Sequence, residues 1–307
     1  MAKTVLITGA SGLIGKPLTK LLLDKGYSVH QLTRNTSKAI EGAKVFKWDV
    51  SRMSIDEKCI ENVEAVINLA GEGIAEKAWT RKRKKQLVKS RTDSLLLIND
   101  LLKRKPSHQI KTFISLSAVG HYGDRKDETL TEDSEPGTDF LANTCLAWER
   151  AADKFVNSGF RVAILRTGMV LSSDGGALPK LAKPITLGLG AALGSGKQWM
   201  PWIHIEDTIQ LITYVLENDS VKGIFNMTAP FPVTNKEFTR ALARQLQKPL
   251  WLPRVPEIAL RILLGEMSRV ALNSTKTTSD KIIESGYMFK YPKLEQALEN
   301  IYGKDSA

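Results

Sequence analysis

Strand-like and helix-like segments alternate along the first half of the chain. Short apolar runs rich in β-branched residues are separated by longer stretches in which apolar side chains recur every three or four positions. This alternation is typical of βαβ units and predicts an α/β fold with a doubly wound parallel sheet. The runs expected as strands are KTVLIT, YSVHQLT, AKVFKW, EAVINLA, KTFISLS, FRVAILRT and, further along, KGIFNMT.

Four helices are expected between these strands. The first lies in LIGKPLTKLLLDKG and ends near Gly26. The second runs through WTRKRKKQLVKSRTDSLLLINDLLKRK, and the third spans roughly residues 139–157 and holds Cys145. The fourth, in IEDTIQLITYVLEN, is expected to be capped by Asp207.

A glycine-rich turn, TGASGLIG, joins the first strand to the first helix. The spacing of Gly9, Gly12 and Gly15 suits a tight turn, a close approach of the backbone to a pyrophosphate and close packing of helix on strand. The helix N-terminus then offers unpaired N–H groups to the phosphates. Between a buried strand and a helix, this triplet predicts a Rossmann-type domain that binds a dinucleotide.

The end of the second strand indicates which dinucleotide is bound. An acidic residue there accepts from the ribose 2′-hydroxyl of NAD, whereas an arginine accommodates the 2′-phosphate of NADP. The sequence has LTRN at this point, with Arg34 and without an acidic residue. We therefore expect NADP(H) to be preferred over NAD(H).

The composition and the pattern of apolar positions change after Arg166. Residues 172–202 are rich in glycine and proline, and the chain from FPVTNKEFTRALARQLQ onward has a mostly helical pattern. We expect residues 1–170, with 203–228 returning to them, to form the Rossmann domain. Residues 171–202 and 229–307 are expected to form a smaller, mostly helical C-terminal lobe on the substrate side.

Charge and rare residues narrow the class of protein. The formal net charge is +11, but the densest basic run, RKRKK, falls on an amphipathic helix without a nucleic-acid motif, so we interpret it as a solvated face. The four histidines lack metal-ligand spacing, and AALGSGKQ departs from a phosphate loop at Ala191 and Gln198. We expect no metal, no nucleotide triphosphatase and no nucleic-acid partner.

The same features favour a cytoplasmic protein that binds no membrane. No run approaches the roughly 18 apolar residues of a membrane span, and MAKTVLITGASG lacks a signal-peptide pattern. The amphipathic stretch PEIALRILLGEMSRVAL is interpreted as core or subunit interface, with a membrane-surface helix as the alternative. Two cysteines, Cys59 and Cys145, suit a reducing compartment. The oligomeric state stays open.

With these features the chain resembles the extended short-chain dehydrogenase/reductase superfamily. Within it, the chain is similar to an atypical branch of NAD-dependent epimerase/dehydratase-like proteins, some of which are labelled cell-division-inhibitor-like. The resemblance covers almost the whole chain. Its motifs are NLAGEGI, SAVGHYG, FLANTCLAWE, RTGMVLSSDGGAL, LGSGKQWMPWIHIED and TAPFPVTNKEFTRALA.

This resemblance, together with the glycine-rich turn, implies a set of cofactor-binding residues near the carboxyl ends of the strands. They are Gly9, Ser11, Gly12, Leu13, Ile14, Gly15, Thr33, Arg34, Asn35, Asp49, Val50, Leu69, Ala70, Gly71, Glu72, Arg91, Thr167, Gly168 and Val170.

The resemblance also implies an unusual catalytic set. Ordinary members carry Tyr-x-x-x-Lys on the helix after the fifth strand, but Leu141 and Cys145 occupy those two positions here. Ser117 matches the usual serine, and Arg91 stands where a structural asparagine is usual. Cys145 can serve as a proton donor or nucleophile if a nearby cation lowers its pKa, or it can be a small core residue. Tyr122 is a second candidate acid, and Glu72 a candidate base.

Two hypotheses for function follow. The first is an NADP(H)-dependent oxidoreductase or epimerase acting on a small substrate, bound in a pocket formed by residues 172–202 and the helical tail. An aromatic cluster of Trp199, Trp202 and Phe231 indicates an apolar or planar substrate. The second is a catalytically silent NADPH-binding sensor or interaction protein, because both the tyrosine and the lysine are missing.

Overall fold

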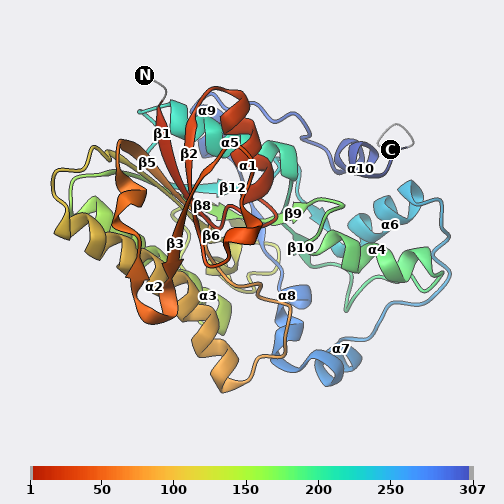
Figure 1. The fold of residues 1–307 in the computed structure, drawn as a ribbon. Coiled ribbons are helices and arrows are strands. Elements are labelled where there is room, and N and C mark those ends of the chain that lie inside the picture. Colours follow the sequence, from red (N-terminus) through yellow and green to blue (C-terminus); the bar gives the residue numbers. More distant parts are fainter. Residues whose placement is uncertain (1–2, 304–307) are drawn as a thin grey trace.

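The computed structural model describes residues 3–303, which are built around an eight-stranded sheet (Figure 1). The strand order is β12-β8-β6-β5-β1-β2-β3-β4, and all neighbours are parallel except β3 and β4. The strands are β1 Thr4–Thr8, β2 Ser28–Thr33, β3 Lys44–Asp49, β4 Ser54–Ile55, β5 Val63–Asn68, β6 Thr112–Ala118, β8 Arg161–Thr167 and β12 Gly223–Met227. Every predicted strand is present, and the predicted doubly wound fold is confirmed.

The strand order reverses direction at β1. The chain first builds outward through β2, β3 and β4, then returns to place β5 on the other side of β1 and builds outward again. Open α/β sheets bind their ligands in the crevice at such a switch point, beyond the carboxyl ends of the strands. Here those ends lead into the glycine-rich turn after β1 and the segment Leu69–Glu72 after β5.

Helices cover both faces of the sheet. Helices α2 (Arg81–Arg104) and α3 (Phe140–Val156) pack against each other on one face, and α1 (Gly15–Asp24) and α5 (Ile205–Glu217) pack together on the other (Figure 1). The predicted apolar stripe of α2 is buried, whereas its basic residues Arg81, Lys82 and Lys85 are exposed. No described helix combines the length and the apolar character needed to cross a membrane.

A second hydrophobic cluster forms away from the sheet. Leu178, Trp202, Phe238 and Leu298 belong to it, and they come from segments far apart in the chain. The helices outside the sheet domain are α4 Leu178–Thr186, α6 Asn235–Gln245, α7 Glu257–Leu264, α8 Arg269–Leu272 and α10 Leu294–Tyr302. Helix α9 (Asp280–Glu284) returns to the sheet, packs against β12 and places Ile282 in the sheet core. The short strand pairs are β7 Thr129–Leu130 with β14 Lys276–Thr277, β9 Met169–Leu171 with β11 Trp202–His204, and β10 Trp199–Met200 with β13 Val233–Thr234.

The predicted lobe boundaries stay a prediction. The ends of the two predicted ranges, residues 1–2 and 304–307, lie outside the described residues.

The prediction that Asp207 caps α5 was wrong. The cap is His204, whose Nδ1 accepts from the amide of Glu206 at 3.1 Å. Asp207 lies in the first turn of the helix, and its buried carboxylate accepts from the amides of Lys290 and Tyr291 at 2.7 and 2.9 Å. Asp207 therefore fastens the segment before α10 to the sheet domain.

A buried ion pair ties three elements of the sheet domain together. Arg166, on β8, donates from Nε and Nη2 to the two carboxylate oxygens of Glu149 on α3, each at 2.9 Å. Ser117, on β6, donates to the same carboxylate at 2.6 Å, and Arg166 also donates to the hydroxyl of Tyr122 at 3.0 Å. Burial alone would lower the pKa of Arg166, but its bonds to Glu149 raise it.

We expect Glu149→Gln to lower the free energy of unfolding by about 3–5 kcal/mol, because it leaves the Arg166 guanidinium buried without a counter-charge. Urea titration of the two proteins measures the difference. The matched control is Glu128→Gln, which breaks an exposed pair with Arg125 and should change stability by about 1 kcal/mol or less. Equal small effects of the two substitutions would contradict the assigned role of the buried pair.

Candidate active site

The turn after β1 is shaped by two of its three glycines. Gly9 has φ 67°, and a Cβ on it would lie 2.8 Å from the carbonyl oxygen of Leu69. A Cβ on Gly15 would lie 2.2 Å from the carbonyl oxygen of Gly9, so α1 can start this close to β1 only with glycine there. Gly12 is different, since it is exposed and a Cβ on it would meet nothing closer than 3.2 Å. Packing within the chain therefore constrains Gly12 less than Gly9 and Gly15, and a methyl group there needs only a small shift of the Gly9 carbonyl.

The start of α1 has hydrogen-bond donors to offer. Its N-cap, Ile14, gives no side-chain bond, and the first turn holds no acidic residue. The amides of Leu13 and Ile14 donate to no acceptor among the described residues. A helix N-terminus in this state is suited to an anion.

The ends of β2 and β3 form the next part of the crevice. Arg34 follows β2, is exposed, and makes no hydrogen bond or ion pair within the described part of the chain. The hydroxyl of Thr33 donates to the carbonyl of Asn35 at 2.9 Å and so fixes the backbone around Arg34. At the end of β3 the Asp49 carboxylate accepts from the amides of Ser51 and Arg52. Asp49 thereby caps a short 3-10 helix, Val50–Arg52, which ends the strand.

The loop after β5 is held by Thr8, which sequence reasoning did not single out, and by Asn68, the first residue of the NLAGEGI motif. The hydroxyl of Thr8 donates to Asn68 Oδ1 at 2.8 Å and accepts from the amides of Leu69 and Ala70, each at 3.1 Å. Thr8 therefore joins the ends of β1 and β5, the two strands at the switch point. A polar residue at the end of each buried strand, Thr8 and Asn68, was the available signal.

Glu72 is engaged and is not a free base. Its carboxylate forms an ion pair with Arg83 and accepts from Gln86 Nε2 at 3.0 Å. The backbone of the same loop receives Arg91, which donates from Nη2 to the Glu72 carbonyl at 2.9 Å. A Cβ on Gly71 would lie 3.4 Å from the Arg91 side chain, so Arg91 packs directly against the predicted cofactor loop.

Cys145 lies on α3 at the edge of a cavity, with 5% of its surface exposed. Burial raises the pKa of its thiol to about 12, and the carboxylate of Glu149 acts in the same direction. Arg91 opposes the shift but does not cancel it. Arg91 alone therefore does not give Cys145 a low pKa, because desolvation outweighs the charge, and the catalytic role of Cys145 stays a prediction.

Ser117 and Tyr122 are fully buried and do not line this cavity. Ser117 donates to Glu149, and Tyr122 donates to Asn226 Oδ1 at 2.7 Å while accepting from Arg166. The structure thus brings Arg91 and Cys145 together and assigns Ser117 and Tyr122 to the network behind them. That network centres on Glu149 and Arg166, which sequence reasoning missed, although an arginine inside the buried strand FRVAILRT was a signal.

The cavity has a volume of about 1180 Å³ and lies between the sheet domain and the smaller helices. Its walls come from the ends of β6 and α3 on one side and from α4, α6, α7 and α8 on the other. Among the described residues that line it, four are charged, namely Glu76, Arg91, Lys180 and Arg269. Most of the others are apolar, among them Leu181, Met200 and Leu242.

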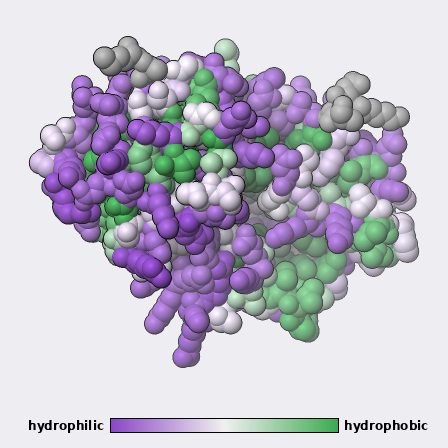
Figure 2. Space-filling view, viewed as in Figure 1, coloured by the Kyte–Doolittle hydropathy of each residue, from purple (hydrophilic) through white to green (hydrophobic). Residues whose placement is uncertain are grey.

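Helix α7 forms an outer wall of the cavity and is apolar on both sides. Leu260 and Leu264 line the cavity, whereas Ile258 and Ile262 are 71% and 82% exposed. Figure 2 shows the resulting apolar surface over α7, beside a hydrophilic one. The stretch PEIALRILLGEMSRVAL is therefore not core within this chain.

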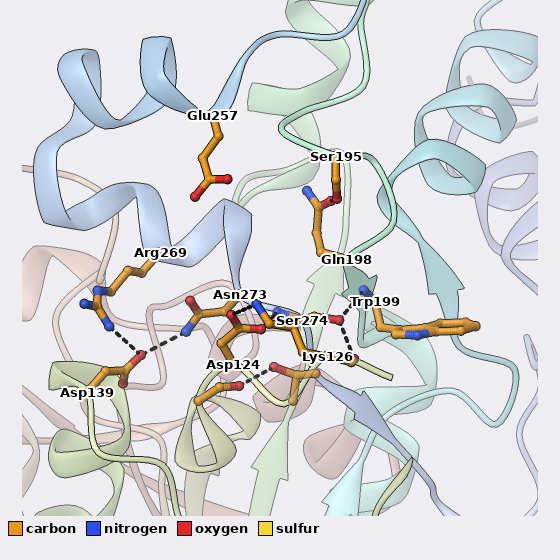
Figure 3. A network of polar contacts seen from close by, with 12 residues as sticks. Asp124, Lys126, Asp139, Ser195, Gln198, Trp199, Glu257, Arg269, Asn273 and Ser274 are labelled. Carbon is orange, nitrogen blue, oxygen red and sulfur yellow. Dashed lines mark hydrogen bonds and ion pairs between the residues drawn. The ribbon is translucent and has the colours of Figure 1, made fainter. Parts of the chain in front are cut away.

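A polar network anchors the chain after α7 to the sheet domain (Figure 3). Asp139 caps α3 through the amide of Ala142 at 2.9 Å, and its other oxygen accepts from Asn273 Nδ2 at 2.9 Å and pairs with Arg269 at 3.7 Å. Ser274 donates from its hydroxyl to the carbonyl of Lys126 at 2.6 Å. Because Arg269 and Asn273 line the cavity, this network fixes one wall relative to α3.

The expected aromatic cluster does not form. Trp199 lines the cavity, with its indole N–H donating to Asp127 at 2.9 Å, but Trp202 is buried in the second hydrophobic cluster and Phe231 is 53% exposed. Gln198, in the rejected phosphate-loop stretch, is buried and donates to the carbonyls of Leu193 and Ala271. Within residues 3–303, no three His, Cys, Asp or Glu side chains gather as metal ligands do.

Two family models match this chain. The model described as the NAD dependent epimerase/dehydratase family matches residues 5–228, which include the sheet and the glycine-rich turn. A second, described as a domain of unknown function (DUF1731), matches residues 255–301, which include α7 and the segment anchored in Figure 3.

Curated relatives are similar over nearly the whole chain. The epimerase family protein SDR39U1 homolog, chloroplastic, of Arabidopsis thaliana is 39% identical over 97% of this chain and 86% of its own length. The epimerase family protein YfhF of Bacillus subtilis is 36% identical, with 97% of each chain covered.

Solved structures share the fold. The human epimerase family protein SDR39U1 (isoform 2), solved with NADPH, has a TM-score of 0.87 at 29% identity and covers 98% of this chain and 99% of its own. MoeE5, solved with UDP-glucuronic acid and NAD, has a TM-score of 0.79 at 19% identity over 99% and 100%, a likeness of fold alone. With the fold, the glycine-rich turn and these matches in agreement, the chain belongs to the NAD dependent epimerase/dehydratase family, as an atypical extended short-chain dehydrogenase/reductase.

Proposed function

We propose that this chain binds NADP(H) in the crevice above β1, β2 and β5 and acts as an oxidoreductase or epimerase on a substrate in the adjoining cavity. The observation that carries the cofactor assignment is Arg34, an exposed cation with no partner among residues 3–303, at the end of β2, where NAD-specific proteins place an acidic residue. The free amides at the start of α1 and the open approach at Gly12 fit a pyrophosphate. The solved human relative was crystallised with NADPH, which supports the same choice.

The cofactor, when bound, supplies the hydride chemistry, so the chain itself must position the substrate and handle a proton. Of the four candidate catalytic residues, Arg91 and Cys145 face the cavity. We assign to Arg91 the binding of a substrate oxygen and to Cys145 a neutral thiol beside it. Ser117 and Tyr122 keep a supporting role, because the Glu149–Arg166 pair occupies their hydroxyls.

A second candidate function is an NADPH-binding protein without turnover. It is favoured by the raised pKa of Cys145 and by the full burial of Ser117 and Tyr122, which leave no strong acid at the cavity among the proposed residues. Following NADPH absorbance while adding fractionated small-molecule extract separates the two. Substrate-dependent oxidation establishes the enzyme, whereas tight NADPH binding without oxidation in every fraction favours the silent protein.

We expect Arg34→Asp to weaken NADPH binding at least tenfold, about 1.4 kcal/mol, and to narrow or invert the preference over NADH, because a carboxylate repels the 2′-phosphate. Fluorescence titration with both cofactors measures this. Lys38→Asp makes the same charge change at an exposed position four residues away and should leave the preference intact. If the two variants behave alike, Arg34 does not read the 2′-phosphate.

Gly12→Ala should separate binding from folding. The added methyl meets nothing closer than 3.2 Å within the chain, so stability should change by about 1 kcal/mol or less. The methyl would stand in the path of the pyrophosphate, and affinity for NADPH and NADH should both fall at least tenfold. Gly15→Ala, with a clash at 2.2 Å, should instead destabilise the fold. Normal cofactor affinity in a folded Gly12→Ala protein would contradict the proposal that the pyrophosphate binds at this turn.

Neither cysteine should react readily in the folded protein. Burial raises the pKa of both Cys145 and Cys59 to about 12, so at pH 8 the thiolate fraction is on the order of 10⁻⁴. Iodoacetamide should label neither residue in native protein over minutes and both in urea, as read by mass spectrometry. Fast labelling of Cys145 in the native protein would contradict this prediction and support Cys145 as a nucleophile.

A further inference from the structure

We propose that the cavity receives an amphipathic anion, a ligand with a long or broad apolar body and one carboxylate or comparable anionic group, and that Arg91 binds the anionic end. This proposal rests on the proposed function, because it concerns the substrate side of the same site. Among the described residues that line the cavity, the walls are mainly apolar and Arg91 is the one cation that is not exposed.

The cavity favours an apolar body. Its volume of about 1180 Å³ exceeds the roughly 300–1,000 Å³ of ordinary small-molecule pockets. Three of its four charged lining residues, Glu76, Lys180 and Arg269, are exposed, and Arg269 is paired with Asp139. The rest of the described lining is mainly apolar, with leucine, methionine, isoleucine and valine side chains from several helices and loops. A smaller set of neutral polar residues lies among them, namely Thr144, Asn235, Thr239, Asn273 and Thr275.

Arg91 is the exception in that interior. Its guanidinium lies 5.1 Å from the ring centre of Trp148, and burial lowers its pKa. Its acceptors are all neutral, namely the carbonyls of Leu87 and Glu72, each at 2.9 Å, and the Ser90 hydroxyl at 3.3 Å. No carboxylate of the described residues forms an ion pair with it.

The nearby carboxylates are already paired elsewhere. Glu72 is held by Arg83 and Gln86, and Glu149 by Arg166 and Ser117. Buried charges in proteins are normally paired, because removing one from water is expensive. Arg91 therefore lacks one counter-charge that a ligand can supply.

The remaining donors of Arg91 match a carboxylate. A guanidinium has five N–H groups. Two on Nη1 and one on Nη2 have acceptors in the described chain, which leaves Nε–H and one Nη2–H without one. Two donors on one planar group suit the two oxygens of a carboxylate. The Trp148 ring and the three bonds hold that group in place beside Cys145.

A nucleotide sugar suits this cavity less well. Such a substrate brings a diphosphate, a ribose and a sugar, which need several cations and many hydrogen-bonding groups. The cavity offers one interior cation and a mainly apolar lining. The substrates named for the solved neighbours of low identity therefore do not transfer to this chain.

The test is calorimetric titration of the full chain with decanoate, decanol and UDP-glucose, each with and without saturating NADPH. Decanoate should bind, decanol at least tenfold more weakly, and UDP-glucose not measurably. Arg91→Gln should weaken decanoate at least tenfold and leave decanol unchanged. Decanol binding as tightly as decanoate, or UDP-glucose binding in place of decanoate, would overturn the proposal.

Two exposed leucines provide a control for surface binding. Leu189 is 58% exposed and lines the cavity, whereas Leu187 is 65% exposed and does not. Leu189→Glu should weaken decanoate at least tenfold, and Leu187→Glu should not. If decanoate binds both variants and Arg91→Gln alike, it binds the surface, and the cavity assignment fails.

Titrations with NADPH distinguish a failure of this proposal from a failure of the proposed function. If Arg91→Gln weakens NADPH but not decanoate, the missing anion belongs to the cofactor and the substrate class is wrong while cofactor binding stands. If wild type binds decanoate as described but not NADPH, the proposed function fails while the ligand class stands.

Discussion

The pairing of Glu149 with Arg166 is the interaction on which the active-site half of the structure depends. It joins β6, α3 and β8 in the interior, where a carboxylate and a guanidinium are tolerated only together. Cys145 lies one turn before Glu149 on α3. The ion pair that holds Glu149 therefore also fixes the position of the Cys145 thiol at the edge of the cavity. The neutral state of His121, whose pKa burial lowers to about 4, leaves Arg166 as the counter-charge.

Two buried arginines illustrate how environment assigns a role to a side chain. Arg166 is bonded by two oxygens of one carboxylate, and its charge is satisfied within the fold. Arg91 is equally fixed, by carbonyls, a hydroxyl and an indole ring, but none of these groups carries a charge. The first arginine therefore contributes to structure, and the second keeps its electrostatic potential directed at the cavity.

The sheet and the glycine-rich turn after β1 were largely predictable, because both depend on local patterns. Buried strands have short apolar runs, Gly9 has a positive φ, and Gly15 is required by a contact within the turn. The cap of α5 was not predictable in this way. Asp207 has the right residue type near the right position, but the segment Tyr287–Tyr291, some eighty residues away, takes its oxygens.

The segments around the cavity were expected from the sequence, since residues 172–202 and the helical tail both contribute to its lining, but the side chains within them were not. Trp199 and Trp202 are three positions apart, yet Trp199 on β10 lines the cavity and Trp202 on β11 lies in a separate hydrophobic cluster. The sequence left the pKa of Cys145 open, because it shows which charges can be near and does not show how much water is excluded.

The two halves of the site also differ in how much of the chain each one needs. The glycine-rich turn, Arg34, Asp49 and the loop after β5 all lie within the first 72 residues, and β1, β2, β3 and β5 can pair among themselves. The cavity needs walls drawn from Gly73 to Thr275. During synthesis from the N-terminus, these parts of the proposed dinucleotide crevice are therefore made long before the walls of the cavity, whereas the candidate cofactor residues Arg91, Thr167, Gly168 and Val170 follow later. The apolar wall on α3 is covered by α4, α6, α7 and α8, which are synthesised only after most of the chain has been made.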